Sequence, residues 1–326
     1  MSLSKSRAFV SGTIFGSALT LSNVASPRII KDQFKLSDFH MLLTFLSASA
    51  SSAIVFAIYN SRQQERLPLK KDSSYGWIAR FDGNMIGGAA LGVGMAVSGA
   101  CPGTALVQAV AGIENSRSLA VGCLLGGVIF VKLRQYLDQA PHSAEAKHTV
   151  MEMTRWSQGL TLLAYESLMI AAIAVLHLLA PRGHYLLHPA LGGILLGLGQ
   201  VASVLLTKKP VGVSTAYEEL GRYFWATIEG KAKPATESIF FSAGILAGAR
   251  LVMYFVPATL QSLHRADKVS WVSAICGGGL LTFGARLAGG CTSGHGISGM
   301  SAMGLSSFVT ITSTFVSAIT TTFWLS

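Results

Sequence analysis

The chain has 326 residues, of which 51% are hydrophobic and only 12% are charged, and its formal net charge is +10. Soluble domains carry about 25% charged residues, so this composition excludes an ordinary soluble enzyme and indicates a polytopic membrane protein. The excess of Lys and Arg falls in loops between apolar runs, which is typical of cytoplasmic loops and argues against nucleic acid as a partner.

Nine apolar segments follow one another along the chain, each close to the roughly 20 residues that a membrane-spanning helix requires. Long stretches within 39–61, 83–113 and 287–326 contain no Asp, Glu, Lys or Arg. The segments are predicted at 7–26, 38–60, 83–100 and 117–137, then at 160–180, then at 189–206, 238–256, 269–290 and 304–325. We therefore predict an all-α, multi-pass protein of the cell membrane.

The order of these segments predicts how the chain is divided. Residues 1–137 form a first membrane repeat, 138–188 a polar loop and a linking transmembrane helix, and 189–326 a second repeat, all in one membrane domain. Four spans return the chain to its starting side, so a single linking span makes the second half start on the opposite side. We expect inverted repeats with broken helices near the membrane midplane. Irregular backbone at that depth must be buried in protein or line a cavity.

Two cysteine-containing stretches are the most informative part of the sequence. Residues 98–104 read Ser-Gly-Ala-Cys-Pro-Gly-Thr, and residues 289–295 read Gly-Gly-Cys-Thr-Ser-Gly-His; each ends a glycine-rich apolar segment. Cys101 and Cys291 are 190 positions apart. The same offset aligns the preceding glycines, Gly87 with Gly277, Gly88 with Gly278, Gly94 with Gly284 and Gly99 with Gly289. This register indicates a duplication, with two cysteine turns facing each other across a small-molecule path.

Two kinds of glycine are distinguished by their surroundings. Pairs four residues apart allow close helix packing, and we expect this role for Gly12 and Gly16, Gly122 and Gly126, and Gly244 and Gly248. Glycines beside the cysteines are expected to expose backbone N–H groups, which bind anions. These candidates for substrate binding are Gly99, Gly103, Gly290 and Gly294.

The four cysteines are expected to differ in role. Cys123 and Cys276 lie inside apolar segments, where a thiol usually behaves as a small buried hydrophobe. Cys101 and Cys291 lie in turns, where a weak S–H donor and a polarisable sulfur can hold a sulfur-bearing anion without retaining it. Two alternatives stay open for this pair. One is a metal site with His295, and the other is a disulfide or persulfide relay.

Charged and polar groups inside the apolar segments are few, which makes them informative. Arg286 lies five residues before Cys291 and either attracts an anion or pairs with Glu166 or a backbone carbonyl. His295 either lines the path or is a satisfied packing residue. Both residues are candidates for substrate binding.

The stretch Ser98–Thr104 and the stretch Gly284–Gly299, which reads Gly-Ala-Arg-Leu-Ala-Gly-Gly-Cys-Thr-Ser-Gly-His-Gly-Ile-Ser-Gly, resemble the signature of the YeeE/YedE sulfur-transport family. Gly12–Gly16 and Gly212–Tyr217, which contains Ser214, are also similar to repeats of that family. The resemblance implies import of thiosulfate, handed between pore cysteines by S–H···S contacts. It makes Ser214 a further candidate for substrate binding. Members often have another cysteine in the first repeat turn, which reads Leu-Ser-Asn-Val-Ala-Ser-Pro here.

The leading hypothesis is therefore a transporter that imports thiosulfate or a related small sulfur anion, without a cofactor or a metal. An intracellular sulfur-carrier protein is one candidate partner. The alternative is a membrane thiol enzyme or redox relay that uses Cys101 and Cys291 as nucleophiles. The sequence gives that reading no general base close to Cys101, and only His295 close to Cys291.

Loop charges predict the orientation in the membrane. The N-terminus and loops 61–82, 138–159 and 207–237 share one predicted side and hold thirteen Lys and Arg. Loops 27–37, 181–188 and 257–268, on the other side, hold six. Positive loops favour the cytoplasm, so the N-terminus is predicted inside and the C-terminus outside.

Overall fold

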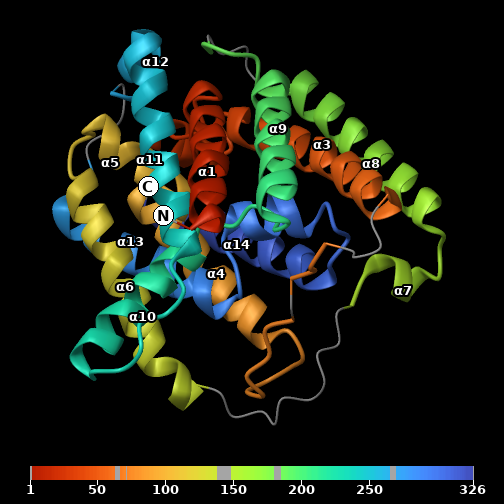
Figure 1. Ribbon diagram of the computed structural model, residues 1–326. Coiled ribbons are helices and arrows are strands. Elements are labelled where there is room, and N and C mark those ends of the chain that lie inside the picture. Colours follow the sequence, from red (N-terminus) through yellow and green to blue (C-terminus); the bar gives the residue numbers. More distant parts are fainter. Residues whose placement is uncertain are drawn as a thin grey trace.

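The protein is described here from a computed structural model, which places residues 2–62, 67–70, 72–137, 148–179, 185–264 and 269–325. In these ranges the regular elements are helices, with one isolated β-bridge between Thr149 and Gly304 (Figure 1). The long helices are α1 (Leu3–Leu21), α3 (His40–Arg62), α4 (Asp82–Ser98), α6 (Ser116–Leu137), α8 (Gln158–Leu179), α9 (Pro189–Thr207), α11 (Glu237–Phe255), α13 (Trp271–Leu287) and α14 (Leu305–Leu325).

These long helices coincide with the nine predicted apolar segments. Seven stretches of the described chain are long and apolar enough to cross a membrane, and one of them combines α4 with the short helix α5 (Pro102–Ala111). Helix α13 is apolar but has only 17 residues, and α1 carries two basic residues in its first two turns. The all-α, multi-pass membrane fold is thus confirmed, whereas nine complete spans remain a prediction.

Several shorter elements complete the fold. They are α2 (Pro27–Phe34), α7 (Val150–Thr154), α10 (Thr215–Ile228), α12 (Pro257–Leu263) and the π-helix η1 (Ser293–Gly299). Helix α10 lies within residues 207–237, the stretch that the loop-charge count treats as a loop. Within the predicted linking region, residues 138–147 and 180–184 lie outside the described residues.

Helices α4 and α13 cross at the centre of the molecule through the glycines that the 190-residue offset aligned. A Cβ atom on Gly87 would lie 2.7 Å from the carbonyl oxygen of Gly284, and one on Gly94 would lie 2.8 Å from that of Gly277. Only glycine leaves room for backbones this close. The crossing places the two helices that lead to Cys101 and Cys291 in direct contact.

Other glycine pairs bring the outer helices together, as predicted. A Cβ on Gly12 or Gly16 would collide with the backbone of α11, and one on Gly244 or Gly248 would collide with that of α1. On α6, a Cβ on Gly122 or Gly126 would likewise collide with the backbone of α13. Helix α6 packs on α13 and α14 packs on α4, so each central helix has one outer partner.

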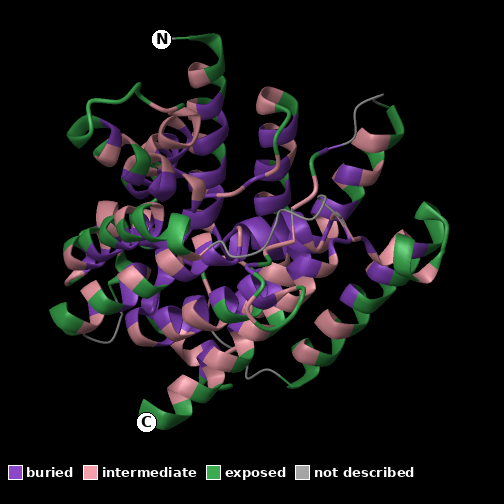
Figure 2. Ribbon diagram, turned by 90° about the horizontal axis from the view of Figure 1, so that it is seen from below, coloured by how far each residue is buried: buried purple, intermediate pink, exposed green. Residues whose placement is uncertain are grey.

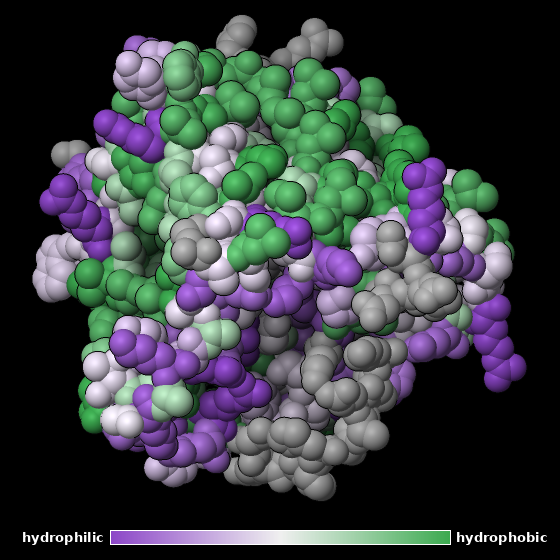
Figure 3. Space-filling model, in the orientation of Figure 1, coloured by the Kyte–Doolittle hydropathy of each residue, from purple (hydrophilic) through white to green (hydrophobic). Residues whose placement is uncertain are grey.

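Burial follows the same arrangement, with buried residues concentrated at the centre and exposed ones at the periphery (Figure 2). Helix α8 lies at the edge of the molecule, and most of its apolar side chains are exposed, as expected of the predicted linking span. Hydrophobic side chains cover the upper part of the face in Figure 3, and hydrophilic ones gather on its lower part. The apolar area is of the kind that the hydrocarbon core of a bilayer covers.

Candidate functional site

The first cysteine turn interrupts a helix at the centre of the fold. Helix α4 ends at Ser98, and Gly99 takes the left-handed conformation at φ +66°, which glycine adopts without strain. Cys101 then caps α5: its Sγ accepts from the backbone N–H of Thr104 at 3.4 Å, and its own N–H donates to Thr104 Oγ1 at 2.7 Å. The half-buried sulfur therefore lies at a helix N-terminus, where partial positive charge favours an anion.

The second cysteine turn is more deeply buried. Helix α13 ends at Leu287, Gly289 turns the chain at φ +82°, and Cys291 precedes η1. Its Sγ lies 3.1 Å from Ser293 Oγ. The backbone N–H groups of Gly294 and Ser214 and the Ser214 hydroxyl also face this sulfur. Several hydrogen-bond donors thus converge on one thiol that is only 1% exposed.

Both turns line one small cavity of about 40 Å³. The first turn contributes Cys101, Gly103 and Thr104, and the second contributes Thr292 and Ser293. The remaining lining is apolar and includes aromatic side chains from α1, α3 and α14. A largely apolar space with one sulfur on its wall and another behind Ser293 suits a weakly hydrated solute better than a strongly hydrated one.

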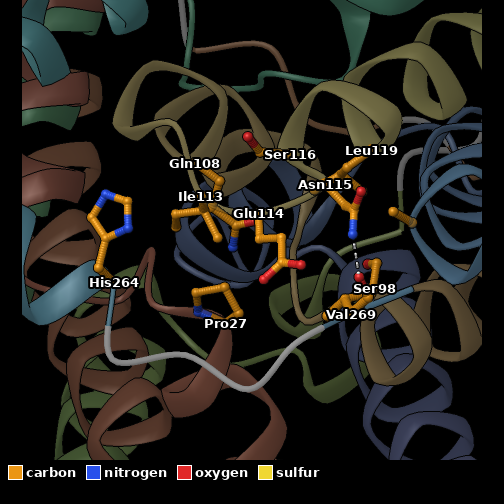
Figure 4. Close-up of a pocket in the computed structure, with 11 residues that line it drawn as sticks. Pro27, Ser98, Gln108, Ile113, Glu114, Asn115, Ser116, Leu119, His264 and Val269 are labelled. Carbon is orange, nitrogen blue, oxygen red and sulfur yellow. Dashed lines mark hydrogen bonds between the residues drawn. The ribbon is translucent and has the colours of Figure 1, made fainter. Parts of the chain in front are cut away.

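A larger cavity, of about 200 Å³, lies beside the first turn (Figure 4). It is lined by Ser98 and Pro27, and a Cβ built on Gly99 would lie 3.1 Å from Cβ of Pro27. Glu114 extends into it, and His264 lies at one side of it in Figure 4. This cavity therefore borders the first turn on the side of α2 and α12.

Arg286 is paired, but not with the partner considered from sequence. Its guanidinium forms an ion pair with Glu218 of α10, so the suggested pairing with Glu166 is wrong. Glu218 also pairs with Arg222 and, at 3.3 Å, with Arg134 of α6. Glu166 lies on the peripheral helix α8, far along the chain from this cluster, whereas α10 folds against α6 and α13.

This cluster has an excess of positive charge. Burial raises the pKa of Glu218, but Arg286, Arg222 and Arg134 lower it by more, so the carboxyl has a pKa below its ordinary value. One carboxylate then faces three guanidinium groups. Arg286 Nη1 also donates to Ser214 Oγ at 3.4 Å, which ties the cluster to the surroundings of Cys291.

His295 is fully buried and both of its ring nitrogens are used. Nε2 lies 3.0 Å from the carbonyl oxygen of Ala288, and Nδ1 lies 2.9 Å from Ser307 Oγ. Nε2 must carry the proton to donate to the carbonyl, so Nδ1 accepts from the hydroxyl. These bonds agree with the alternative in which His295 is a satisfied packing residue. They join the end of α13 to α14. In the described part of the chain, no three His, Cys, Asp or Glu side chains gather as metal ligands.

The remaining predicted glycines lie in or beside the two cysteine turns. A Cβ on Gly290 would lie 2.9 Å from the His295 ring, so this glycine provides room for the imidazole. A Cβ on Gly294 would lie 3.3 Å from Nζ of Lys70, a residue that the sequence argument did not single out. Gly103 borders the shared cavity in the first turn.

Tyr217 is a second residue that the sequence argument missed, although it ends the quoted stretch Gly212–Tyr217. Its hydroxyl donates to the carbonyl oxygen of Pro102 at 2.8 Å, and Cys123 is close enough to interact with it electrostatically. Cys123 is fully buried, as predicted, but Cys276 is exposed on α13, so the prediction of a buried thiol at that position is wrong. Tyr217 thus connects α10 to the first cysteine turn.

Comparison with known proteins gives a consistent result. A family model described as "Sulphur transport" matches residues 21–320, nearly the whole chain. Two proteins of Xylella fastidiosa named "Probable transporter" are similar over 113 residues, with 36% identity in strain 9a5c and 35% in strain Temecula1. In both, the match covers 75% of the relative and 35% of this chain, so these relatives are roughly half as long.

Proposed function

Because the chain belongs to the sulphur-transport (YeeE/YedE) family of membrane transporters, we propose that it imports thiosulfate or a closely related small sulfur anion. The observation that carries this proposal is the cavity shared by Cys101 of the first turn and Thr292 and Ser293 of the second. A solute in this cavity meets one thiol directly. Ser293 separates it from the other thiol, since Ser293 Oγ is 3.1 Å from Cys291 Sγ.

The proposed path runs through three positions. The anion enters the larger cavity beside Gly99, passes Cys101 into the apolar cavity, and leaves past Ser293 and Cys291. Neither thiol carries a fixed charge that would hold the anion strongly, and conduction requires sites that also release. The terminal sulfur of thiosulfate accepts an S–H hydrogen bond, and its polarisability suits the apolar wall.

Inverted repeats at 1–137 and 189–326, with 138–188 as the link, are part of the same proposal. The contact of Gly87 with Gly284 becomes, at the 190-residue offset, the contact of Gly277 with Gly94, and both occur. A two-fold axis through the α4–α13 crossing accounts for this exchange. It also accounts for α6 packing on α13 as α14 packs on α4.

Growth of a host that cannot assimilate sulfate tests the proposal. Expressed in its cell membrane, the chain should allow growth on thiosulfate as sole sulfur source, with uptake of labelled thiosulfate. An intracellular sulfur carrier would then consume the imported ion. Purified protein that converts sulfur compounds, in cells that show no uptake, would instead favour the thiol enzyme.

Competition between anions tests how the substrate is selected. Sulfate presents only oxygens and is more strongly hydrated, so entering the apolar cavity costs it more than it costs thiosulfate, whose terminal sulfur is polarisable. A difference of about 1.4 kcal/mol is already tenfold discrimination. Excess sulfate should therefore leave thiosulfate uptake nearly unchanged, and equal inhibition by sulfate and unlabelled thiosulfate would contradict selection by the cysteines.

A further inference from the structure

Lys70 lies against the second cysteine turn, although it belongs to the loop between α3 and α4. Its Nζ would be 3.4 Å from a Cβ built on Gly290, 3.3 Å from one on Gly294 and 3.6 Å from one on Gly212. The ammonium group therefore occupies the space that the missing side chains of three glycines leave open. Cys291 and Arg286 are close enough to interact with it electrostatically.

The loop holds Lys70 in this place from both sides. Three residues earlier, Leu67 is 5% exposed, packs with Phe56 and Val204, and donates its N–H to Asn60 Oδ1 at 3.0 Å. Three residues later, Ser73 Oγ donates to the carbonyl oxygen of Leu287, at the end of α13, at 2.6 Å. A lysine fixed in this way is not an ordinary solvated lysine of a surface loop.

The segment that faces Lys70, at Val211 and Gly212, is also fixed. Ser298 Oγ of η1 donates to the carbonyl oxygen of Val211 at 2.8 Å, which holds Gly212 beside the turn. The neighbouring acidic group, Glu218, is already shared by three arginines. Among the described residues, no carboxylate forms an ion pair with Lys70, and the neighbouring cluster has three guanidinium groups for one carboxylate, an arrangement that favours an anion.

We infer that Lys70, with the glycine backbone of residues 290–294, forms an anion-binding site next to Cys291, on the side of the turn away from the apolar cavity. Its ligand class is a small oxyanion, held by the ammonium and by backbone N–H groups. The inference rests on the proposed function for its substrate, since the site would receive the sulfur anion as it passes Cys291. An anion on the proposed path would pass the uncharged thiol of Cys101 first and the positively charged Lys70 afterwards.

The charge selectivity of Cys291 tests this site without any transport assay. Purified full-length protein is treated with anionic sulfonatoethyl methanethiosulfonate or cationic trimethylammonioethyl methanethiosulfonate, and modification rates at each cysteine are followed by peptide mass spectrometry. In the wild type, Cys291 should react faster with the anionic reagent. Lys70→Met should lower the anionic-to-cationic rate ratio at Cys291 about tenfold or more, as loss of a charged contact predicts.

Matched controls separate this effect from a general change. Lys70→Arg keeps the charge and should stay within about threefold of the wild-type ratio. Lys231→Met removes an exposed lysine paired with Glu229 and should leave the ratio unchanged. Cys101 in the same samples serves as an internal reference. Lys70→Gln replaces Lys70→Met if the latter is not recovered folded.

Three results would overturn the site: an unchanged ratio in Lys70→Met, an equal fall in Lys231→Met, or no modification of Cys291 by either reagent. The last result would mean that no anion reaches the sulfur. If the charge selectivity is present but cells take up no sulfur anion, the anion site stands and the proposed function fails.

Discussion

At the scale of single residues, the two central cysteines differ in what their sulfur atoms do for the fold. Cys101 acts as the N-cap of α5 in a reciprocal arrangement with Thr104, a role that serine and threonine usually fill. Cys291 is instead surrounded by donors from Ser293, Gly294 and Ser214. A hydroxyl can replace either sulfur in hydrogen bonding, but it lacks the softness of sulfur.

Replacing each cysteine by serine should therefore separate function from folding. Cys101→Ser and Cys291→Ser should insert normally, and Cys101→Ser should keep or raise the melting temperature because serine is a good cap. Both should abolish thiosulfate uptake, and the double variant should be no worse than the worse single one. The measurement is uptake at matched membrane expression.

The matched controls are Cys123→Ser and Cys276→Ser, which should retain most uptake. Cys276 is exposed on the outside of α13, and Cys123 is buried beside Tyr217, where the change costs at most some packing. Equal uptake in all four variants would mean that the cysteine turns are packing elements only.

Glu218 is a buried charged residue whose loss should strongly affect stability. It is 3% exposed and is the counter-charge for Arg286, Arg222 and Arg134. Glu218→Gln leaves these guanidinium groups without their counter-charge, which should lower the free energy of unfolding by about 3 kcal/mol or more. Thermal unfolding in detergent should show a clear fall in melting temperature.

A double variant tests whether the loss of stability comes from the ion pair between Glu218 and Arg286. Glu218→Gln with Arg286→Met removes both charges, so its loss should be smaller than the sum of the single losses. Glu229→Gln, on an exposed glutamate paired with two lysines, should leave the melting temperature unchanged. Additive losses in the double variant would argue against direct coupling of Glu218 and Arg286.

At the scale of elements, the crossing of α4 and α13 positions both cysteine turns. Each helix is followed by a glycine with positive φ, Gly99 or Gly289. The next helix then begins just after the cysteine. Because the two helices touch through glycine backbones, a small increase in their separation would move one turn relative to the other. The shared cavity depends on that separation.

Gly284→Ala should disturb this crossing. Its Cβ would lie 2.5 Å from the backbone nitrogen of Leu91, which cannot move away as a side-chain end can. Overpacking of this kind costs about 1–3 kcal/mol. We expect a lower melting temperature together with reduced uptake, measured on the same preparation.

Gly159→Ala provides the comparison, because a Cβ there meets no atom within 4 Å. Near the start of α8, alanine should be neutral or slightly favourable for the helix. If Gly284→Ala is as stable as Gly159→Ala, the close α4–α13 contact does not determine the geometry of the site.

At the scale of the whole molecule, contacts between loops sort into two groups that match the two predicted membrane sides. On one side, Asp72 bonds His148 at 3.0 Å, and Glu237 accepts from Ser4. On the other, Tyr185 donates to Asp38 at 2.8 Å, and the loop after α5 reaches the segment before α13 through Asn115. The cavity of Figure 4 and Lys70 lie on opposite sides in this division.

Reporter fusions at the two ends test the topology. With nine spans, the N-terminus should be cytoplasmic and the C-terminus external, as the thirteen-to-six distribution of Lys and Arg favours. A phosphatase that is active only outside the cell should therefore be active at the C-terminus and inactive at the N-terminus. Termini on the same side would exclude nine spans.

Sequence alone determined the features that depend on local pattern. Apolar runs placed the nine long helices within a few residues of their bounds, because burial in lipid imposes a minimum length of uncharged chain. Glycines beside Cys101 and Cys291 predicted the helix breaks, and in the structure Gly99 and Gly289 take the positive φ that few other residues adopt. The spacing of Gly12 and Gly16 and of their counterparts predicted close packing for the same steric reason.

Only the tertiary structure decided which distant side chains meet. Arg286 pairs with Glu218 rather than Glu166 because α10 folds back against α13, and no spacing along the chain encodes that contact. His295 could line a path or pack, and its bonds to Ala288 and Ser307 depend on α14. Lys70 looked like one base of a polar loop, and its place beside Cys291 follows from anchors on α3 and α13 that lie far apart in sequence.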